Sequence, residues 1–149
     1  MSSSTVSTTD QRRALITEVW SAAWDEGDVD ALDRLLATDY RRHGAEGGDG
    51  LTRDEFKASI TATRSAFPDL VTSVEDVVVE GDRAAVRWRS TGTHQHSFLG
   101  VPATRRSVEV SGATFAHFGD DGLVHVEQVT WDPRALLSAL GIITVGADR

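Results

Sequence analysis

A carboxylate lies inside an otherwise apolar, strand-like segment near the C-terminal end of the chain. It belongs to Glu127, in the sequence VHVEQVTW. Because side chains alternate between the two faces of a strand, Glu127 shares a face with His125, Val129 and Trp131. If that face lines a pocket, the carboxylate can remove a proton next to a carbonyl group and return it later. Two other roles are open: a solvated charge on the outer face, or an ion pair with an arginine on a neighbouring strand.

Two histidines, His94 and His96, form the second pair of residues that could do chemistry. They follow Trp88, and all three lie on one side of the strand if the strand extends that far. A neutral imidazole can donate a hydrogen bond to a carbonyl oxygen where enolate charge develops, or relay a proton. The two rings could also bind a metal if a carboxylate joined them, but no such third ligand is evident and no metal is expected. A polar strand end near solvent is the alternative, and His96 is expected only at a pocket rim.

Large aromatic residues and two further histidines are candidates for a pocket wall, although each aromatic residue is also an ordinary core residue. His117, beside a turn, faces either inward with Phe115 or outward to solvent. A histidine between a helix and a strand, such as His43, more often has a structural role. Arg87 and Arg89 alternate with apolar residues and are expected to face outward, whereas a lone inward arginine would bind an oxyanion. The candidates for substrate binding are Trp24, Tyr40, His43, Phe67, Trp88, Phe98, His117 and Trp131.

Composition narrows the class of protein. The chain has 149 residues, no cysteine and a formal net charge of −8. The missing thiols exclude disulfides and thiolate metal sites, and the negative charge disfavours nucleic acid and anionic membranes as partners. No apolar run approaches the ~20 residues of a membrane span, and the N-terminus does not have the pattern of a signal peptide. No phosphate loop, nucleophile elbow or zinc signature occurs. A soluble cytoplasmic protein is expected.

Helical periodicity predicts three helices in the first half of the chain and one near its end. Thr9 or Asp10 can cap the first helix, and the sequence TRDE from Thr52 to Glu55 fits a capping box. The last helix has Pro133 at its first position, where proline is favoured. The first three helices are predicted over Thr9–Glu26, Val29–Ala37 and Arg53–Ala66.

Strand-like alternation dominates the second half and places the candidate chemistry on a sheet. Glycines 92, 100 and 112 could supply bends in long strands. Segregated helices and strands predict an α+β fold, with a mostly antiparallel sheet of four or more strands curved around an interior pocket. A disordered tail is expected over residues 1–8 and a single domain over 9–149. The extended segments are predicted over Tyr40–His43, Val74–Glu80, Ala84–Thr93, Ser107–Phe118 and Leu123–Trp131.

Several segments, in order, resemble the SnoaL-like polyketide cyclases of the NTF2-like superfamily. They are WDEGDVDALDRLLATDY, RRHG, FPDL, VVVEGDRAAVRW, STGTHQHSFLGVPATRRSV and FGDDGLVHVEQVTWDPRALLSALG, and they cover Trp20–Gly141. The resemblance implies a cone-shaped α+β barrel, often a dimer, with a hydrophobic pocket open at one end. An aspartate on the last long strand of the aldol cyclases is the general acid/base, and Glu127 matches it. Family members often carry Glu-x-Trp where this chain has Val126 and Gln128. His94 occupies the GTH position of the family, and His43 matches a histidine near the pocket mouth.

The first hypothesis for function is a cyclase that closes a ring in a polyketide intermediate without metal or cofactor. In an aldol version Glu127 takes an α-proton and His94 polarises the acceptor carbonyl. In a pericyclic version of the four-plus-two type, no proton moves and the shape of the pocket orients the chain. The alternatives are a SnoaL-like hydroxylase or isomerase, and a non-catalytic module that binds a small molecule. The expected partners are a polyketide substrate and a second copy of the chain in a homodimer.

Overall fold

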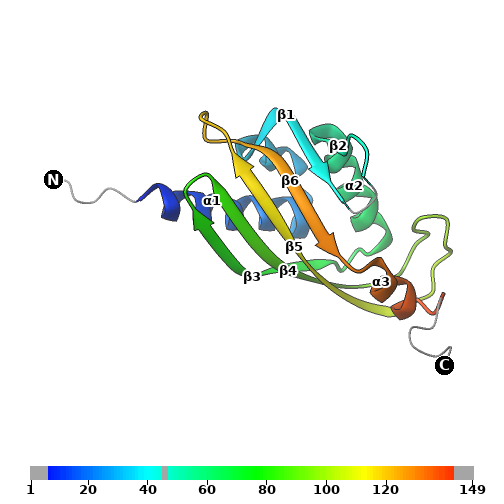
Figure 1. The fold of residues 1–149 in the computed structure, drawn as a ribbon. Coiled ribbons are helices and arrows are strands. Elements are labelled where there is room, and N and C mark those ends of the chain that lie inside the picture. The colour runs from blue at the N-terminus through cyan, green and yellow to red at the C-terminus, as the bar shows by residue number, and fades with distance from the viewer. Residues whose placement is uncertain (1–6, 45–46, 143–149) are drawn as a thin grey trace, which may run out of the picture.

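A computed structural model describes residues 7–44 and 47–142. Most of the predicted tail, residues 1–6, and the segment 143–149 lie outside the described residues. The order of elements confirms the α+β class (Figure 1). The helical elements are α1 (Thr8–Trp20), the π-helical turn η1 (Ser21–Asp25), the 3-10 helix η2 (Val29–Arg34), α2 (Arg53–Ala66) and α3 (Pro133–Ala139). The strands are β1 (Leu36–His43), β2 (Leu51–Thr52), β3 (Val71–Glu80), β4 (Arg83–Thr93), β5 (Ser107–Phe118) and β6 (Val124–Trp131).

The first helix begins at Thr8, one residue earlier than predicted. The Ser7 side chain accepts a hydrogen bond from the Asp10 backbone N–H, so the cap is Ser7 and not Thr9 or Asp10. Further along, the helix widens into the π-helical turn η1 and ends before Gly27, whose φ of 78° suits glycine.

The second predicted helix is wrong over its last residues. Only Val29–Arg34 is helical, as a 3-10 helix, and the chain then enters β1 at Leu36. The apolar residues Leu35, Leu36 and Ala37 suited a helix face, but they are buried because β1 pairs with β6, where Leu36 is opposite Val124. Tertiary pairing therefore overrides a local helical pattern.

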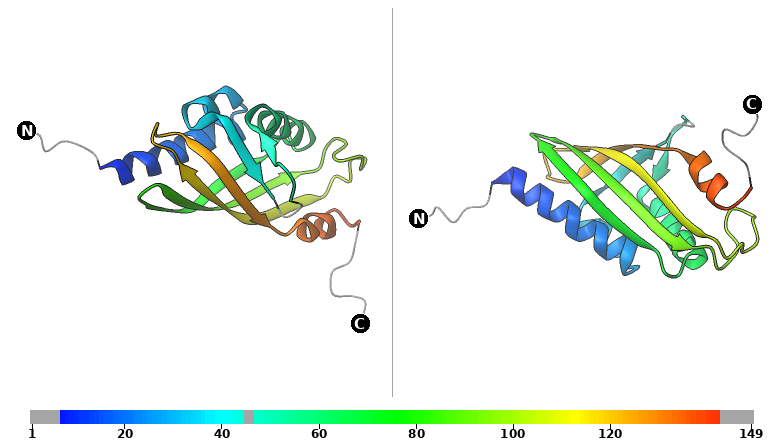
Figure 2. Two further views of the ribbon diagram at one scale, coloured as in Figure 1. Left: turned by 45° about the horizontal axis from the view of Figure 1, so that its top comes forward. Right: turned by 90° about the horizontal axis from the view of Figure 1, so that it is seen from below.

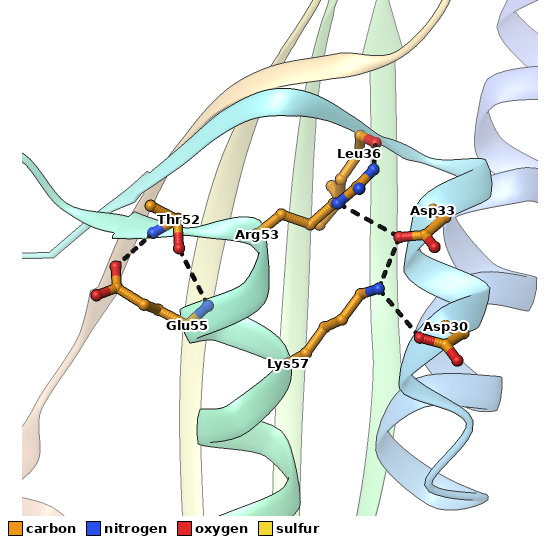
Figure 3. A network of polar contacts seen from close by, with 7 residues as sticks. All are labelled: Asp30, Asp33, Leu36, Thr52, Arg53, Glu55 and Lys57. Atoms are coloured by element: carbon orange, nitrogen blue, oxygen red, sulfur yellow. Dashed lines mark hydrogen bonds and ion pairs between the residues drawn. The ribbon is translucent and has the colours of Figure 1, made fainter.

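The predicted capping box of α2 is confirmed. The Glu55 carboxylate accepts a hydrogen bond from the Thr52 N–H at 2.8 Å, and the Thr52 hydroxyl accepts one from the Glu55 N–H at 3.1 Å (Figure 3). The next turn of α2 carries Lys57, the only lysine of the chain, which pairs with Asp30 and Asp33 of η2. These contacts fix α2 against the short helix η2.

The six strands form one mixed, curved sheet in the order β2-β1-β6-β5-β4-β3. All neighbours are antiparallel except β1 and β6, which run parallel. The sheet curves over α1 and α2, which lie against one of its faces (Figures 1 and 2). Among the described residues β2 and β3 are its two edges, so it is open and does not close into the barrel that the resemblance implied.

The buried apolar residues form two clusters. The larger one lies between α1, α2 and the sheet, and includes Ile16, Val19 and Ile60. The smaller one joins the end of α2 to α3, which packs at the far end of the long strands (Figure 1), through Phe67, Val108 and Leu136. No helix in the described part of the chain is long and apolar enough to cross a membrane.

Candidate functional site

A cavity of about 600 Å³ opens between the inner face of the sheet and the helices. This volume is typical of small-molecule sites. The cavity wall is mostly apolar and aromatic, and it includes all four tryptophans of the chain, Trp20, Trp24, Trp88 and Trp131. A small organic molecule with a large apolar surface would fit such a wall.

The structure separates the predicted site residues into three groups. Tyr40, His94 and Glu127 are buried but are not part of the cavity wall. His117 is exposed on the outer face of the sheet. The predicted residues that do line the cavity are Trp24, His43, Phe67, Trp88, Phe98 and Trp131.

The prediction of His117 as a substrate-binding residue is not supported by its position. Along β5 the neighbours Ala116 and Phe118 are buried in the core, and Phe115 and His117 are exposed. Strand alternation therefore places His117 and Phe115 together on the outer face, which is the second of the two orientations considered.

Glu127 takes part in the ion pair that was one of its alternative roles. Parallel pairing of β1 and β6 sets Arg42 opposite Glu127. Arg42 Nη1 donates to Glu127 Oε1 at 2.8 Å, and the side chains are 13% and 3% exposed. The Tyr40 hydroxyl donates a hydrogen bond to the same oxygen. Arg42 also stacks on Phe56, with its Cζ 4.2 Å from the ring centroid.

Arg42 lines the cavity, while its partners Glu127 and Tyr40 lie behind it. Of the described lining residues, it is the one with a permanent charge. Burial, and then the negative charge of Glu127, raise the pKa of Tyr40 well above its ordinary value, so its hydroxyl stays a donor. The sequence predicted Tyr40 but missed Arg42. The signal was alternation in DYRRH, where residues 40 and 42 share a face.

His94 lies just beyond the predicted end of the strand, so the condition that would align it with Trp88 along the strand is not met. Strand β4 ends at Thr93, and the backbone N–H groups of Gln95 and His96 both donate to the Ala66 carbonyl at the end of α2. His94 is completely buried, and His96 is exposed, as its expected place at a rim implies. The departure of the chain from the sheet is what separates the two rings.

The hydrogen bonds of His94 assign its tautomer. The Thr104 backbone N–H donates to Nδ1 at 3.1 Å, so the neutral ring carries its hydrogen on Nε2. Nε2 is buried and has no partner within the described residues. The ring stacks on Phe67 with centroids 5.4 Å apart, and Phe67 is part of the cavity wall. His94 is therefore a hydrogen-bond donor that is separated from the cavity by the ring of Phe67.

Three local features position tryptophans of the wall. Arg64 Nη1 donates to the carbonyl of Trp24 at 2.7 Å, which fixes the end of the π-helical turn. Trp88 Nε1 donates to Thr114 Oγ1 at 3.1 Å. Gly112 lies opposite both Trp88 and Trp131 in the sheet, and a Cβ there would be 2.5 Å from Trp88 Cζ2. The absence of a side chain at Gly112 therefore leaves room for the Trp88 indole and for the Trp131 side chain.

Within residues 7–44 and 47–142, no three His, Asp or Glu side chains converge as metal ligands. The chemistry available at the cavity from these residues is hydrogen bonding and charge stabilisation from Arg42, with a buried carboxylate and a buried imidazole close behind the wall. The arrangement is suited to hold an apolar molecule and to contact one of its oxygen atoms.

Comparison with known structures gives neighbours from streptomycetes. The candidate hydroxylase AclR from Streptomyces galilaeus is 28% identical with a TM-score of 0.79, covering 91% of this chain and 98% of its own. TsrD from Streptomyces laurentii is 30% identical with a TM-score of 0.77, covering 88% and 95%. IdmH from Streptomyces antibioticus, a candidate polyketide cyclase, is 29% identical with a TM-score of 0.73, covering 88% and 99%.

A comparison with curated proteins gave no match. The family model described as SnoaL-like polyketide cyclase matches residues 14–140, which is most of the chain and includes the second half of α1 and every later element through α3. The structural neighbours support a general role as a polyketide-related enzyme. The chain belongs to the SnoaL-like polyketide cyclase family.

Proposed function

We propose that the protein is a cyclase that closes a ring in a polyketide intermediate without a metal or cofactor. The observation that carries the proposal is the cavity of about 600 Å³, walled by aromatic side chains and containing one ion-paired arginine. A flexible chain confined there loses the freedom that opposes ring closure, and orientation alone can supply ~7–11 kcal/mol of a barrier.

The aldol version assigns the proton transfer to Glu127 and carbonyl polarisation to His94. Both side chains are buried close behind the wall, which supports roles next to a substrate, but neither contacts the cavity directly. The pericyclic version needs no titratable group in the wall, and Arg42 and His43 are the only such groups among the described lining residues. The small number of titratable groups favours closure that is driven mainly by shape and orientation.

Substitution of Glu127 by glutamine separates the two versions, because the amide keeps the size of the side chain but cannot accept the proton. The assay supplies a linear poly-β-ketone, which can close by an aldol step, and a linear polyene ketone with a conjugated diene and an alkene, which can close by the four-plus-two route. Products of equal mass, or of that mass less one water, are followed by chromatography and mass spectrometry. General-base catalysis predicts a loss of ~100-fold to 10,000-fold in turnover. A loss below tenfold would remove Glu127 as the base and leave the pericyclic version. The exposed neighbour Gln128, changed to alanine, is the control.

A hydroxylase role is the second candidate, because the neighbour AclR carries that description at 28% identity. Hydroxylation adds an oxygen atom and needs an oxidant, whereas cyclisation conserves mass or loses water. Turnover in air and under anaerobic conditions therefore decides between them: unchanged turnover without oxygen supports the cyclase, and its loss supports the hydroxylase. If the protein only binds its ligand, no product forms in either condition.

The homodimer implied by the family remains part of the proposal. Multi-angle light scattering of the purified chain gives its mass in solution, and a mass near the 16.1 kDa of one chain would exclude a dimer under those conditions.

A further inference from the structure

We infer that Arg42 forms an oxygen-binding subsite of the cavity, which takes a carbonyl or enolate oxygen of the ligand, with Glu127, Tyr40 and Phe56 as its positioning residues. The inference rests on the proposed function only in that the cavity is taken as the substrate site. It assigns a role to Arg42, which was not among the site residues predicted from the sequence.

The position of Arg42 is the first argument. Its side chain is 13% exposed and lies on a wall that is otherwise mostly apolar. A hydrogen bond formed there is shielded from water and is stronger than one at the surface. A cation in this position would be costly without a partner, and Glu127 supplies that partner.

The rigidity of Arg42 is the second argument. Its guanidinium is held by Glu127 at 2.8 Å and lies over the ring of Phe56. Tyr40 in turn holds the carboxylate of Glu127. A guanidinium has five N–H donors in a fixed plane, and the contact with Glu127 uses Nη1, so donors on the other nitrogens can meet a ligand. Such preorganised donors are effective where negative charge develops on an oxygen.

The balance of charge indicates the class of ligand. Arg42 and the ionised Glu127 together carry no net charge, so the subsite suits a neutral carbonyl oxygen that gains partial negative charge as it reacts. A full carboxylate would be repelled by Glu127. Two buried polar atoms that have no partner within residues 7–44 and 47–142, Trp20 Nε1 and His94 Nε2, are donors as well. The ligand that fits is an apolar molecule with several carbonyl oxygens.

The test uses two naphthalene probes that differ in one oxygen, 2-acetylnaphthalene and 2-ethylnaphthalene. Because all four tryptophans line the cavity, quenching of their fluorescence reports its occupancy. The wild type is expected to bind the ketone more tightly by about tenfold, the value of one hydrogen bond of ~1.4 kcal/mol. Arg42→Met should abolish this preference, and Arg42→Lys should keep part of it. Arg41→Met is the matched control, because Arg41 is the exposed neighbour and should leave the preference unchanged.

A third probe, 2-naphthoate, tests the role of Glu127, the ion-pair partner of Arg42. Glu127→Gln removes the repelling charge and should raise the affinity for this carboxylate, and the gain should disappear in the double variant with Arg42→Met. A structural ion pair that never contacts ligand predicts no such gain. If Arg42→Met fails to fold, as judged by circular dichroism, Arg42→Lys and Glu127→Gln still decide the question.

Two negative outcomes are distinguishable. Equal binding of both neutral probes to the wild type, with no effect of Arg42→Lys or Arg42→Met, would overturn the subsite and leave the cavity as a binding site. Failure of all three probes to change the fluorescence of the wild type would overturn the subsite together with the cavity on which the proposed function depends.

Discussion

Gly112 is a strand glycine that lies between two tryptophans of the cavity wall, Trp88 and Trp131. A Cβ there would be 2.7 Å from the Thr130 carbonyl oxygen and 2.8 Å from Trp131 Cβ, in addition to its clash with Trp88. The carbonyl belongs to the paired strand and cannot rotate away. Gly112→Ala is therefore expected to cost ~1–3 kcal/mol of unfolding free energy, as overpacking does, measured by urea titration. It should also shift the tryptophan emission.

Gly92→Ala is the matched control, since Gly92 is also a strand glycine and itself lines the cavity. Its new Cβ would meet the Phe67 Cβ at 3.2 Å, a milder contact with a side chain. If both substitutions have the same cost, the close contacts with Trp88, Thr130 and Trp131 are not the reason that position 112 needs a glycine.

At the same scale, single residues show how far the sequence could predict the site. A charge in the apolar run of β6 was a sufficient signal for Glu127, because burial of such a residue requires a partner. The identity of that partner depends on a parallel register between Arg42 and Glu127, which lie 85 positions apart in the chain. Alternation indicates that residues 40 and 42 share a face of β1, but local patterns carry no information about which strand lies beside them. The ion pair of Arg42 was therefore missed.

Among the elements, Lys57 links α2 to η2, together with an ion pair between Arg53 and Asp33 (Figure 3). Its ammonium lies 2.8 Å from Asp33 and 3.1 Å from Asp30, and its side chain is 15% exposed. The carboxylates are more exposed, which limits the strength of the pair. Lys57→Met should therefore reduce the unfolding free energy by up to ~1 kcal/mol at low salt, measured by urea titration.

Added salt distinguishes this electrostatic contribution from packing. The difference between wild type and Lys57→Met should shrink in 1 M NaCl, where the screening length falls to about 3 Å. Arg34→Met, which removes an exposed pair with Glu18, is expected to have a smaller effect at low salt. A cost of Lys57→Met that is independent of salt would instead indicate lost packing of the lysine stem.

Elements with strong local signals were predicted well, and those that depend on pairing were not. The capping box fixed the start of α2. Its end at Ala66 follows from Pro68, which disfavours helical backbone angles at Phe67. The strand β1 was predicted only over its last four residues, because its first two residues, Leu36 and Ala37, also suit the apolar face of a helix. The two-residue strand β2 exists through its pairing with β1, and no local pattern marks it.

At the scale of the whole molecule, composition and the order of elements were enough for the α+β class, but closure of the sheet was not predictable. Whether the edges β2 and β3 meet depends on the accumulated twist and on the bulges in β3 and β1, such as the register shift between Val74 and Asp76. The open sheet leaves space for the cavity between its curved face and the helices, so the global curvature determines the ligand that fits.

The pH dependence of global stability should report His125, which joins β6 to two other segments. Its Nδ1 lies 2.8 Å from Asp39 Oδ1 in β1, and its Nε2 lies 3.0 Å from Asp121 Oδ2 in the turn before β6. Only the protonated ring can donate both hydrogen bonds at once, because a neutral imidazole carries a single N–H. The hydrogen bond to Asp121, and then the charges of Asp121 and Asp39, raise the pKa of His125 above its ordinary value.

A histidine with a raised pKa stabilises the fold fully below its unfolded pKa of about 6.5, and this contribution is lost as pH rises through the higher folded value. The urea midpoint of the wild type should therefore fall as pH rises from the unfolded value through the higher folded pKa of His125, a range in which the carboxylates stay ionised. His125→Asn should flatten this part of the profile, because the neutral amide does not titrate. His117→Asn, at an exposed position on β5, should leave the slope unchanged. An equal slope in wild type and His125→Asn would show that the two ion pairs of His125 contribute nothing to stability, and that the neighbouring strands hold this end of the sheet by their backbone pairing alone.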